Sequence, residues 1–409
     1  MPPADADLAR SLRLLGLAAF ASMASMRWCD ALLPALADEF STTAGQSAQV
    51  VYAFTIAYGV MQLIYGPLGD RLGKYTVVSF AALACTAGAV ASALAPSLGW
   101  LALARALSGA AAAGIIPLAM AWIGDNVPFE RRQPVLAGLL GATVIGMIAG
   151  QWLAGVFADT VGWRYGFVGV ALLFATAGVA MRMGARAGAS TDAAGRASAE
   201  AGAAGASSLE RMRRVVRDRH ARRILAITAA EGAFAFSAMA FAPSHLHGRF
   251  GIAVSSAGAI LALYGVGGFL YSRIVRWLLA RMDALAMARA GGLLAGLSWL
   301  LFALAPGWIW TLPLCLLSGM GFYMIHNTLQ TQATQMSPEQ RGTAVSLFAF
   351  ALFSGQSVGT AAASVIVDAL STGAVLAGCG IGLAALGLIV GAMARPRAEP
   401  ARPDGRKRN

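Results

Sequence analysis

Twelve long apolar stretches constrain this chain more than any other feature of its sequence. Each is close to the roughly 20 residues that an α-helix needs to cross a bilayer. Because 58% of the residues are hydrophobic and only 12% are charged, the composition excludes a soluble globular protein. The sequence therefore predicts an all-α integral membrane protein with 12 transmembrane helices, which we expect at about 13–36, 48–66, 75–96, 99–123, 134–157, 162–183, 222–243, 253–274, 284–305, 308–331, 342–367 and 372–394.

The predicted helices form two groups of six, separated by a hydrophilic stretch. We expect an N-terminal six-helix bundle over 1–183, a linker over 184–221, a C-terminal six-helix bundle over 222–394 and a basic tail over 395–409. The first part of the linker is rich in Ala, Gly and Ser, and it cannot bury enough apolar surface to fold alone. Its basic second part is expected to form a short helix on the anionic inner leaflet.

The basic residues indicate how the chain is oriented in the bilayer. All but four of the 31 lie at the N-terminus, in the loops after even-numbered helices, in the linker or in the tail. By the positive-inside rule, both termini and the linker are therefore expected in the cytoplasm. The net charge of +12 then reflects membrane topology, and we expect a lipid bilayer and no nucleic acid as a partner. Twenty-nine Arg against two Lys suggest a GC-rich bacterial genome, so we expect a bacterial cytoplasmic (inner) membrane.

The most informative short segment is 66–74, which reads Gly-Pro-Leu-Gly-Asp-Arg-Leu-Gly-Lys and joins the second and third predicted helices. It is expected to form a charged hairpin at the membrane surface, where water solvates the backbone. Its glycines allow two helix ends to approach, and its Asp can face the backbone N–H groups of a neighbouring helix N-terminus. The segment resembles the motif G-x-L-(A/G)-D-R-x-G-(R/K) of the major facilitator superfamily, and the matching residues include Gly66, Gly69, Asp70, Arg71, Gly73 and Lys74.

This resemblance implies two six-helix halves around a midplane cavity, which alternate in access to the two sides of the membrane. It also implies that Asp70 faces the N-terminus of the eleventh helix, at Gly342 and Thr343. The charged residues of segment 66–74 are expected to form an ion-pair network with Asp125 and Arg131. Such a network is a latch that holds the cytoplasmic side closed, and breaking it shifts a conformational equilibrium.

Two further segments resemble motifs of the same superfamily. Arg105 lies in the fourth predicted helix and is followed by glycines, a pattern similar to one of proton-coupled members. An Arg inside a bilayer costs at least about 2.5–3.5 kcal/mol, so it needs a partner or a water-filled cavity. The alternative is an Arg that snorkels to the outer surface.

The fifth predicted helix resembles the antiporter motif Gly-x-x-x-Gly-Pro-x-x-Gly-Gly. Gln151 replaces the proline and Ala154 replaces one glycine, which weakens the assignment to antiporters. Close helix packing explains the same glycine spacing in any membrane protein, and the residues concerned are Gly146, Gly150 and Gly155.

Few acidic residues lie inside the predicted helices. Asp30 follows Arg27 by three residues, so the two side chains share a helix face and can form a buried cluster with Arg105. We expect Asp30 to stay ionised, either as a static ion pair or with a role in coupling. Glu231 is flanked by small residues, which suggest room around its carboxylate, as a central cavity would provide. It has no charged neighbour in sequence, which favours it as the proton carrier.

Polar residues in several predicted helices are candidates for the substrate cavity. His326 and Gln330 are spaced four residues apart and are expected to face the cavity together. The full set of cavity candidates is Arg27, Gln62, His326, Asn327, Gln330 and Gln356.

The resemblance and the residues together predict a proton-coupled secondary transporter that exports a small-molecule substrate. The alternatives are proton-coupled uptake and, less favoured, a membrane sensor with the same fold. No nucleotide-binding, metal-binding or catalytic pattern stands out, so we expect no enzyme activity, no cofactor and no metal. The superfamily resemblance implies a monomer whose partners are the substrate, protons and lipid.

Overall fold

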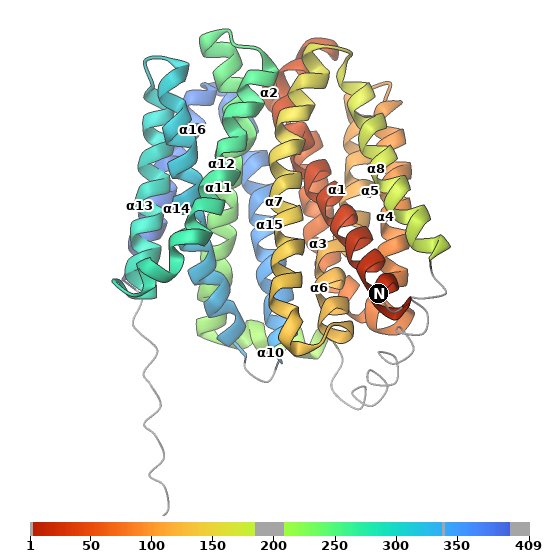
Figure 1. Cartoon of the computed structure of the whole chain (residues 1–409). Helices are drawn as coiled ribbons and strands as arrows, with labels where there is room; N and C mark the ends of the chain where they lie inside the picture. Colours follow the sequence, from red (N-terminus) through yellow and green to blue (C-terminus); the bar gives the residue numbers. More distant parts are fainter. Residues whose placement is uncertain (1–2, 185–207, 338–339, 393–409) are drawn as a thin grey trace, which may run out of the picture.

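The computed structural model describes residues 3–184, 208–337 and 340–392, and these residues are almost entirely helical. Figure 1 shows the first helices and the last helices as two groups that lie side by side. The predicted low-complexity linker and the basic tail fall mainly on residues 185–207 and 393–409, which lie outside the described residues.

The N-terminal half provides six crossings of the bundle. The second crossing consists of a short helix and a long one, and the fourth is similarly divided near Gly114. The helices are α1 (Pro3–Glu39), α2 (Ala44–Ser47), α3 (Gln49–Leu72), α4 (Lys74–Ala93), α5 (Leu98–Ala112), α6 (Ile115–Asn126), α7 (Phe129–Asp159) and α8 (Trp163–Met183).

The C-terminal half repeats this plan after one additional short helix. That helix, α10 (Ser208–Arg217), buries Val215 and forms where the basic linker segment was expected to be helical. The six crossings that follow are α11 (Arg219–Phe250), α12 (Val254–Leu279), α13 (Ala284–Leu304), α14 (Trp308–Gln335), α15 (Arg341–Ala369) and α16 (Thr372–Gly391).

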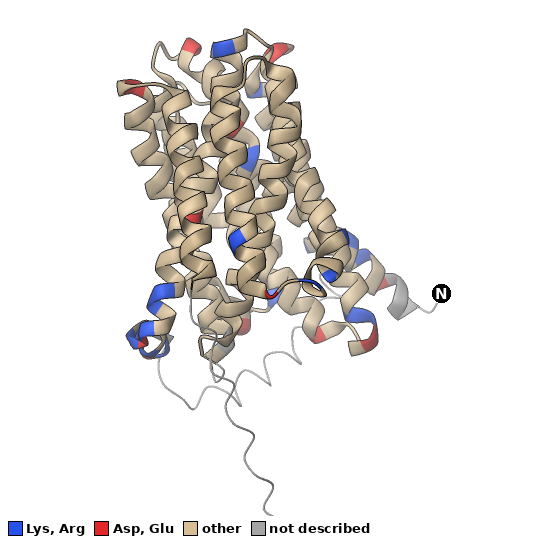
Figure 2. Ribbon diagram, turned by 90° about the vertical axis from the view of Figure 1, so that its left-hand side faces the viewer, with Lys and Arg blue, Asp and Glu red and all other residues tan. Residues whose placement is uncertain are grey.

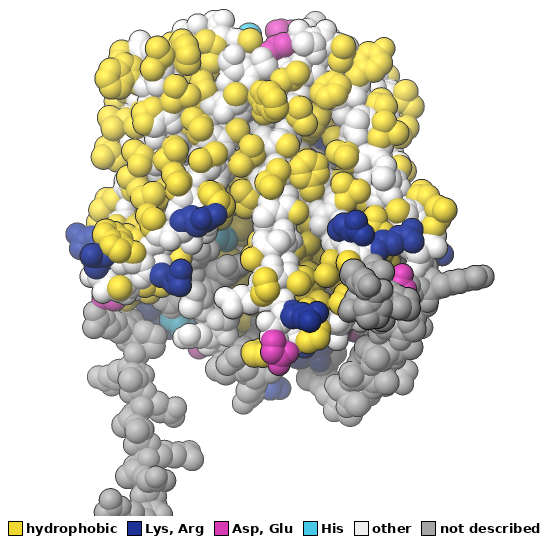
Figure 3. All heavy atoms as spheres, viewed as in Figure 1, with side chains coloured by type: hydrophobic (Ala, Val, Ile, Leu, Met, Phe, Trp, Pro, Cys, Tyr) yellow, Lys and Arg dark blue, Asp and Glu magenta, His cyan; other side chains and the backbone are white. Residues whose placement is uncertain are grey.

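Among the described residues, eleven crossings are helices that are long enough and apolar enough to span a membrane. The remaining crossing is α1, which has 37 residues but carries Arg27 and Asp30 in its interior. The predicted fold class, 12 helices in an all-α membrane protein, is confirmed. Figure 3 shows the corresponding broad belt of apolar side chains, with basic side chains along its lower edge.

The two ends of the helix bundle differ in charge. Lys and Arg gather at the end that contains Lys74 and α10 (Figure 2), which we call the basic end. The other end, where α1 finishes at Glu39 and α15 at Ala369, is called the opposite end.

Segment 66–74 differs from the expected hairpin. Helix α3 continues through Pro67 to Leu72, and the chain turns only at Gly73, whose φ of 92° suits glycine. Helix α4 then begins immediately at Lys74. The prediction of a loop was wrong because charged residues at a membrane surface can remain helical, with water solvating the exposed turn.

Glycines bring α7 close to its neighbours. A Cβ atom at Gly146 or Gly150 would collide with the backbone carbonyls of Phe20 and Ala24 on α1. A Cβ at Gly155 would lie 2.6 Å from the backbone of α12. The three glycines therefore lie at close helix contacts, where a side chain with a Cβ atom would not permit such backbone approach.

Candidate functional site

The N-terminal half contains a fully buried cluster of charged residues. Arg27 donates to Asp30 through Nη1 at 3.4 Å, one helical turn along α1. Arg105 of α5 donates to the hydroxyl of Ser25 at 3.1 Å and to its carbonyl at 2.8 Å. The guanidinium of Arg105 also lies 4.2 Å from the centroid of Phe54. The buried cluster predicted from the sequence is therefore formed, and Arg105 does not snorkel to the outer surface.

The C-terminal half contains a buried acid–histidine pair. Oε2 of Glu231 on α11 lies 3.2 Å from Nδ1 of His326 on α14. The Glu231 side chain is fully buried, whereas the His326 side chain is 13% exposed. The sequence did not predict the His326 partner of Glu231, because the two residues lie 95 positions apart in the sequence.

The small residues beside Glu231 do not enclose a cavity. Gly232 packs against the backbone of Leu352 and Gln356, and Ala229 packs against Gly355. These small residues allow close contact between α11 and α15, so the expected space around the carboxylate is taken by helix packing.

An aromatic chain connects the two charged groups across the halves. The guanidinium of Arg27 lies 4.3 Å from the centroid of Phe236 on α11. Phe236 contacts Phe322 at 5.4 Å between centroids, and Phe322 stacks on His326 at 5.1 Å. Tyr264 also contacts Phe322, at 5.7 Å. The guanidinium of Arg27 in the N-terminal half is thus connected to the acid–histidine pair of the C-terminal half through the phenyl rings of Phe236 and Phe322.

The buried charges at this junction balance. By formal charge, the two buried arginines Arg27 and Arg105 are opposed by the two buried carboxylates Asp30 and Glu231. Several polar atoms here nevertheless lack a hydrogen-bond partner among the described residues. They are Arg27 Nε, Asp30 Oδ1, Gln151 Nε2, Glu231 Oε1, Tyr264 Oη and both amide atoms of Gln356. Buried polar groups without partners are costly, so such a concentration of them is typical of a functional site.

The remaining cavity candidates are only partly brought together. Gln356 of α15 is fully buried and close to Gly232, next to Glu231. Gln62 lies beside Tyr58 on α3. Asn327 neighbours Tyr271 instead of Glu231. Gln330 is exposed and makes no hydrogen bond to His326 in the described part of the chain, so these two side chains do not act as one group.

Two carboxylates join the halves at the opposite end. Asp159, the last residue of α7, accepts from the backbone N–H groups of Val254 at 3.2 Å and Ser255 at 2.7 Å, at the start of α12. Asp368 of α15 accepts from the Thr43 hydroxyl at 2.8 Å and from the Gly45 N–H at 3.2 Å, at the start of α2. We call these four contacts the carboxylate clamps. Both place an anion at a helix N-terminus, where backbone N–H groups and the helix dipole favour it.

The predicted latch at the basic end is partly formed. Lys74 pairs with Asp125 and lies 3.7 Å from Asp70. The Asp70 side chain is 54% exposed, and Gly342 at the start of α15 has open space beside its Cα atom. Among the described residues, the expected contact of Asp70 with Gly342 and Thr343 is not made in this conformation.

The carboxylate clamps include residues that the sequence did not single out for a role. Asp159 lies two residues beyond the end of the fifth predicted helix, and its carboxylate reaches residues about 95 positions away. The only sequence signal is an Asp at the end of the fifth crossing and another near the end of the eleventh, in equivalent positions of the two halves.

Comparison with known proteins identifies the fold and the family. The family model described as Major Facilitator Superfamily matches residues 15–360. Among solved structures, the nucleoside transporter NupG superposes with a TM-score of 0.76 at 14% identity, covering 93% of this chain and 98% of that one. A bacterial homologue of the human lysosomal transporter Spinster superposes with a TM-score of 0.70 at 16% identity, covering 96% and 95% of the two chains.

Curated relatives are similar over shorter segments. The efflux pump dotC of Dothistroma septosporum is 31% identical over 160 residues, which are 39% of this chain and 27% of the relative. The lincomycin resistance protein of Streptomyces lincolnensis is 31% identical over 139 residues, 33% of this chain and 28% of the relative. The matched segments span only about a fifth to two fifths of the length of the curated relatives.

Proposed function

Because this chain belongs to the major facilitator superfamily, we propose that it is a transporter, and specifically a proton-coupled exporter of small molecules. The observation that carries the proposal is the buried Glu231–His326 pair, connected through Phe236 and Phe322 to Arg27 of the other half. The relatives named as an efflux pump and a resistance protein support the direction of transport.

The charge balance at the junction supplies a mechanism for coupling. A proton that binds to Glu231 or His326 adds one positive charge to a group of buried residues that is otherwise neutral. An unbalanced buried charge is strongly unfavourable, so the protonated centre favours a conformation that exposes it to water. Deprotonation on the other side restores the balance. The same pair can therefore drive a conformational cycle by accepting and releasing one proton.

Alternating access would use opposed contacts at the two ends of the bundle. The carboxylate clamps close the opposite end in the conformation described above. In the alternative conformation, Asp70 would contact the N-terminus of α15 and close the basic end, while the clamps separate. The two six-helix halves would then move as units about the Arg27–Phe236 contact.

We place the basic end in the cytoplasm of a bacterium, with the protein in the inner membrane. This orientation follows the excess of Arg and Lys at that end. The protein would function as a monomer, because each half supplies one part of the charged junction and a single chain completes it.

Proton movement in inside-out vesicles tests this function. Vesicles containing the wild type would be acidified inside, and a chemically diverse panel of compounds would be added while a pH-sensitive dye reports the lumen. An exported compound should release protons in the wild type, and Glu231→Gln should abolish that release. Asp30→Asn separates the alternatives for Asp30, because a coupling role predicts loss of proton release and a static ion pair predicts that release continues.

The same vesicle assay also determines the direction of transport and whether transport is coupled to protons. Glu210→Gln, an exposed acid on α10, is the matched control and should leave proton release unchanged. Compound transport without proton flux in the wild type would contradict proton coupling. Proton flux of the opposite sense would identify an uptake transporter.

A further inference from the structure

The C-terminal part of α12 carries a row of alternating aromatic and basic side chains. Phe269, Arg273, Trp277 and Arg281 follow one another at intervals of four residues, so they lie on one side of the helix and of the turn that ends it. The guanidinium of Arg273 lies 4.7 Å from the centroid of the Phe269 ring, and that of Arg281 lies 3.9 Å from the Trp277 ring. Arg276 follows Arg273 by three residues and is its neighbour on the helix surface. We call these five residues the α12 row.

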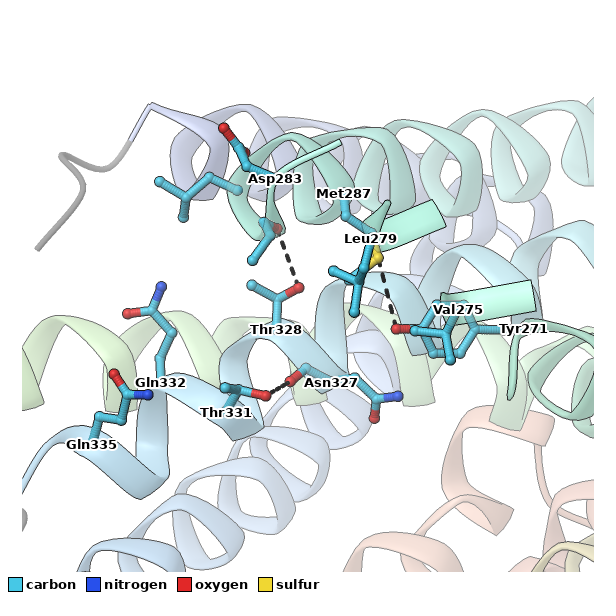
Figure 4. A pocket seen from close by; sticks show the side chains of 12 residues that line it. Tyr271, Val275, Leu279, Asp283, Met287, Asn327, Thr328, Thr331, Gln332 and Gln335 are labelled. Atoms are coloured by element: carbon cyan, nitrogen blue, oxygen red, sulfur yellow. Dashed lines mark hydrogen bonds between the residues drawn. The ribbon is translucent and has the colours of Figure 1, made fainter. Parts of the chain in front are cut away.

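The α12 row faces away from the rest of the bundle. The other side of the helix carries Tyr271 and Val275, which line a pocket together with residues of α13 and α14 (Figure 4). The Tyr271 hydroxyl lies 3.8 Å from the sulfur of Met287 on α13. Arg273 and Trp277 follow Tyr271 by two and six residues, which places them about 200° and about 240° around the helix from it. The packed side and the α12 row are therefore on nearly opposite faces of α12.

The α12 row lies where the apolar belt meets the basic end. Phe269 is 49% exposed and Trp277 is 55% exposed, and the three arginines of the row are exposed as well. Figure 3 shows basic side chains beside apolar ones at the lower left edge of the belt, close to where α12 ends in Figure 1. Aromatic and basic side chains are favoured at this level of a membrane, because lipid headgroups begin there. The row is therefore in a position to contact headgroups.

The three arginines bring positive charge to one face of α12. Within the described residues, none of Arg273, Arg276 and Arg281 forms a salt bridge. Like charges that are neighbours on a helix surface repel one another. An anion between Arg273 and Arg276 would replace this repulsion by two attractions. Arg281 adds a third positive charge on the same side of the molecule.

The residue types of the α12 row favour a phospholipid over a soluble anion. The guanidinium group offers a fork of N–H donors that matches the oxygens of a phosphate. Phe269 and Leu270, which is 40% exposed, extend the row from its arginines into the apolar belt. An acyl chain can pack on these two side chains, whereas a soluble phosphate has nothing to place there. The charge and the apolar surface are thus both matched by an anionic phospholipid.

We propose that the α12 row is a binding site for an anionic phospholipid. The lipid phosphate lies between Arg273 and Arg276, and an acyl chain runs along Phe269 and Leu270. Arg281 attracts the negatively charged headgroup from the other end of the row. The inference depends on the chain being embedded in a bilayer, and it does not depend on proton coupling or on the direction of transport.

Native mass spectrometry of the purified full-length protein in detergent tests the proposal. The probe is phosphatidylglycerol, and phosphatidylcholine with the same acyl chains is the comparison without net charge. The wild type should bind phosphatidylglycerol about tenfold or more tightly than phosphatidylcholine. Replacing Arg273, Arg276 and Arg281 together by Gln should weaken phosphatidylglycerol binding by about 100-fold, because each arginine near an anionic headgroup contributes about fivefold. Glycerol 3-phosphate, a soluble phosphate, should not displace the lipid.

Two further variants serve as controls. Arg249→Gln removes the same charge at the opposite end, where the guanidinium donates to the Ala303 carbonyl at 2.7 Å and lies 5.5 Å from the Phe250 ring. It should change the affinity for phosphatidylglycerol by less than about twofold. The double change Arg273→Lys and Arg276→Lys keeps both charges and should retain the affinity to within about fivefold, because only the forked geometry is lost. This second variant keeps the test decisive even if the triple Gln variant does not fold.

Three results would overturn the proposal. Equal affinity of the wild type for phosphatidylglycerol and phosphatidylcholine would remove the role of charge. Displacement of the lipid by glycerol 3-phosphate would identify a site for soluble phosphate instead of a lipid site. An equal loss of affinity in Arg249→Gln would attribute binding to the net charge of the protein and not to the α12 row. None of these results bears on the proposed proton coupling, because neither Glu231 nor His326 belongs to the row.

Discussion

The guanidinium of Arg27 lies 4.3 Å from the ring centroid of Phe236, and this contact joins the two halves at the level of their buried charges. Arg27 is at the same time paired with Asp30 on its own helix. Phe236 continues the contact to Phe322 and His326. One arginine thus links an ion pair of the N-terminal half to an acid–histidine pair of the C-terminal half.

This contact predicts a specific effect of replacing the ring. Phe236→Leu should destabilise the protein by about 0.5–2 kcal/mol more than Phe241→Leu, because only the first change removes a cation–π interaction. Phe241 is a buried aromatic residue on the same helix and is therefore the matched control. Thermal unfolding of the purified variants measures the difference. Phe236→Tyr keeps the ring and should restore most of the stability, and equal losses for the two Leu variants would argue against the contact.

The carboxylate clamps predict the effect of removing charge at the opposite end. Hydrogen bonds to charged groups contribute about 1.5–3 kcal/mol each, so Asp159→Asn or Asp368→Asn should shift the population toward opening of that end by roughly tenfold. Ser357, which donates to the Tyr52 carbonyl across the halves at 2.9 Å, is a suitable reporter. Ser357→Cys should react faster with an impermeant maleimide in either Asn background, and fastest in the double variant.

The control for the clamps is a carboxylate at the same end. Asp38→Asn removes an exposed charge near the end of α1 that forms no hydrogen bond or ion pair with the C-terminal half among the described residues, so labelling of Ser357→Cys should not change. A similar acceleration by Asp38→Asn would attribute the effect to net charge at the surface and not to the clamps.

The contacts of Arg105 with Ser25 and Phe54 predict that lysine cannot replace it. Its guanidinium donates to both the hydroxyl and the carbonyl of Ser25 and stacks on Phe54. An ammonium group cannot reproduce this planar, forked geometry, so Arg105→Lys should destabilise the protein by about 1–3 kcal/mol and reduce transport. Arg182→Lys, at an exposed arginine 4.7 Å from the Phe80 ring, should have little effect in the same thermal assay. If the Arg105→Lys protein were as stable as the wild type, a single hydrogen-bond donor to Ser25 would be sufficient at this position.

The sequence was sufficient for the fold and for local pairs, because both depend on short-range patterns. Apolar stretches predict the crossings, and a spacing of three residues predicts the Arg27–Asp30 pair. The partner of Glu231 lies on another helix, and sequence does not specify how α11 and α14 are rotated about their axes. For the same reason the small residues beside Glu231 suggested an open space, although they pack against α15. Asp159 was missed because a carboxylate at a helix end is ordinarily solvated.

Glycine packing on α7 predicts a contrast between two substitutions on one helix. Gly150→Ala should destabilise the protein by about 1–3 kcal/mol, because the new Cβ would collide with the backbone of Ala24 on α1. Gly141→Ala meets nothing within 4 Å and should be neutral or stabilise by up to about 1 kcal/mol, since alanine is the better helix former. Thermal unfolding measures both. A stable Gly150→Ala protein would mean that α1 and α7 can separate without cost.

Asp70 predicts an effect of opposite sign to that of the carboxylate clamps. In the conformation described here its side chain is 54% exposed and contributes only a weak pair with Lys74, so Asp70→Asn should leave this conformation nearly unchanged in energy. If Asp70 stabilises the alternative conformation by contact with the N-terminus of α15, its loss lowers the population in which the opposite end is open. Labelling of Ser357→Cys should therefore slow in Asp70→Asn and accelerate in Asp159→Asn. Combining the two changes should return the rate toward that of the wild type, because the variants act on opposite sides of one equilibrium. Faster labelling in Asp70→Asn would instead assign this aspartate to the conformation seen here and remove its role as a latch for the other.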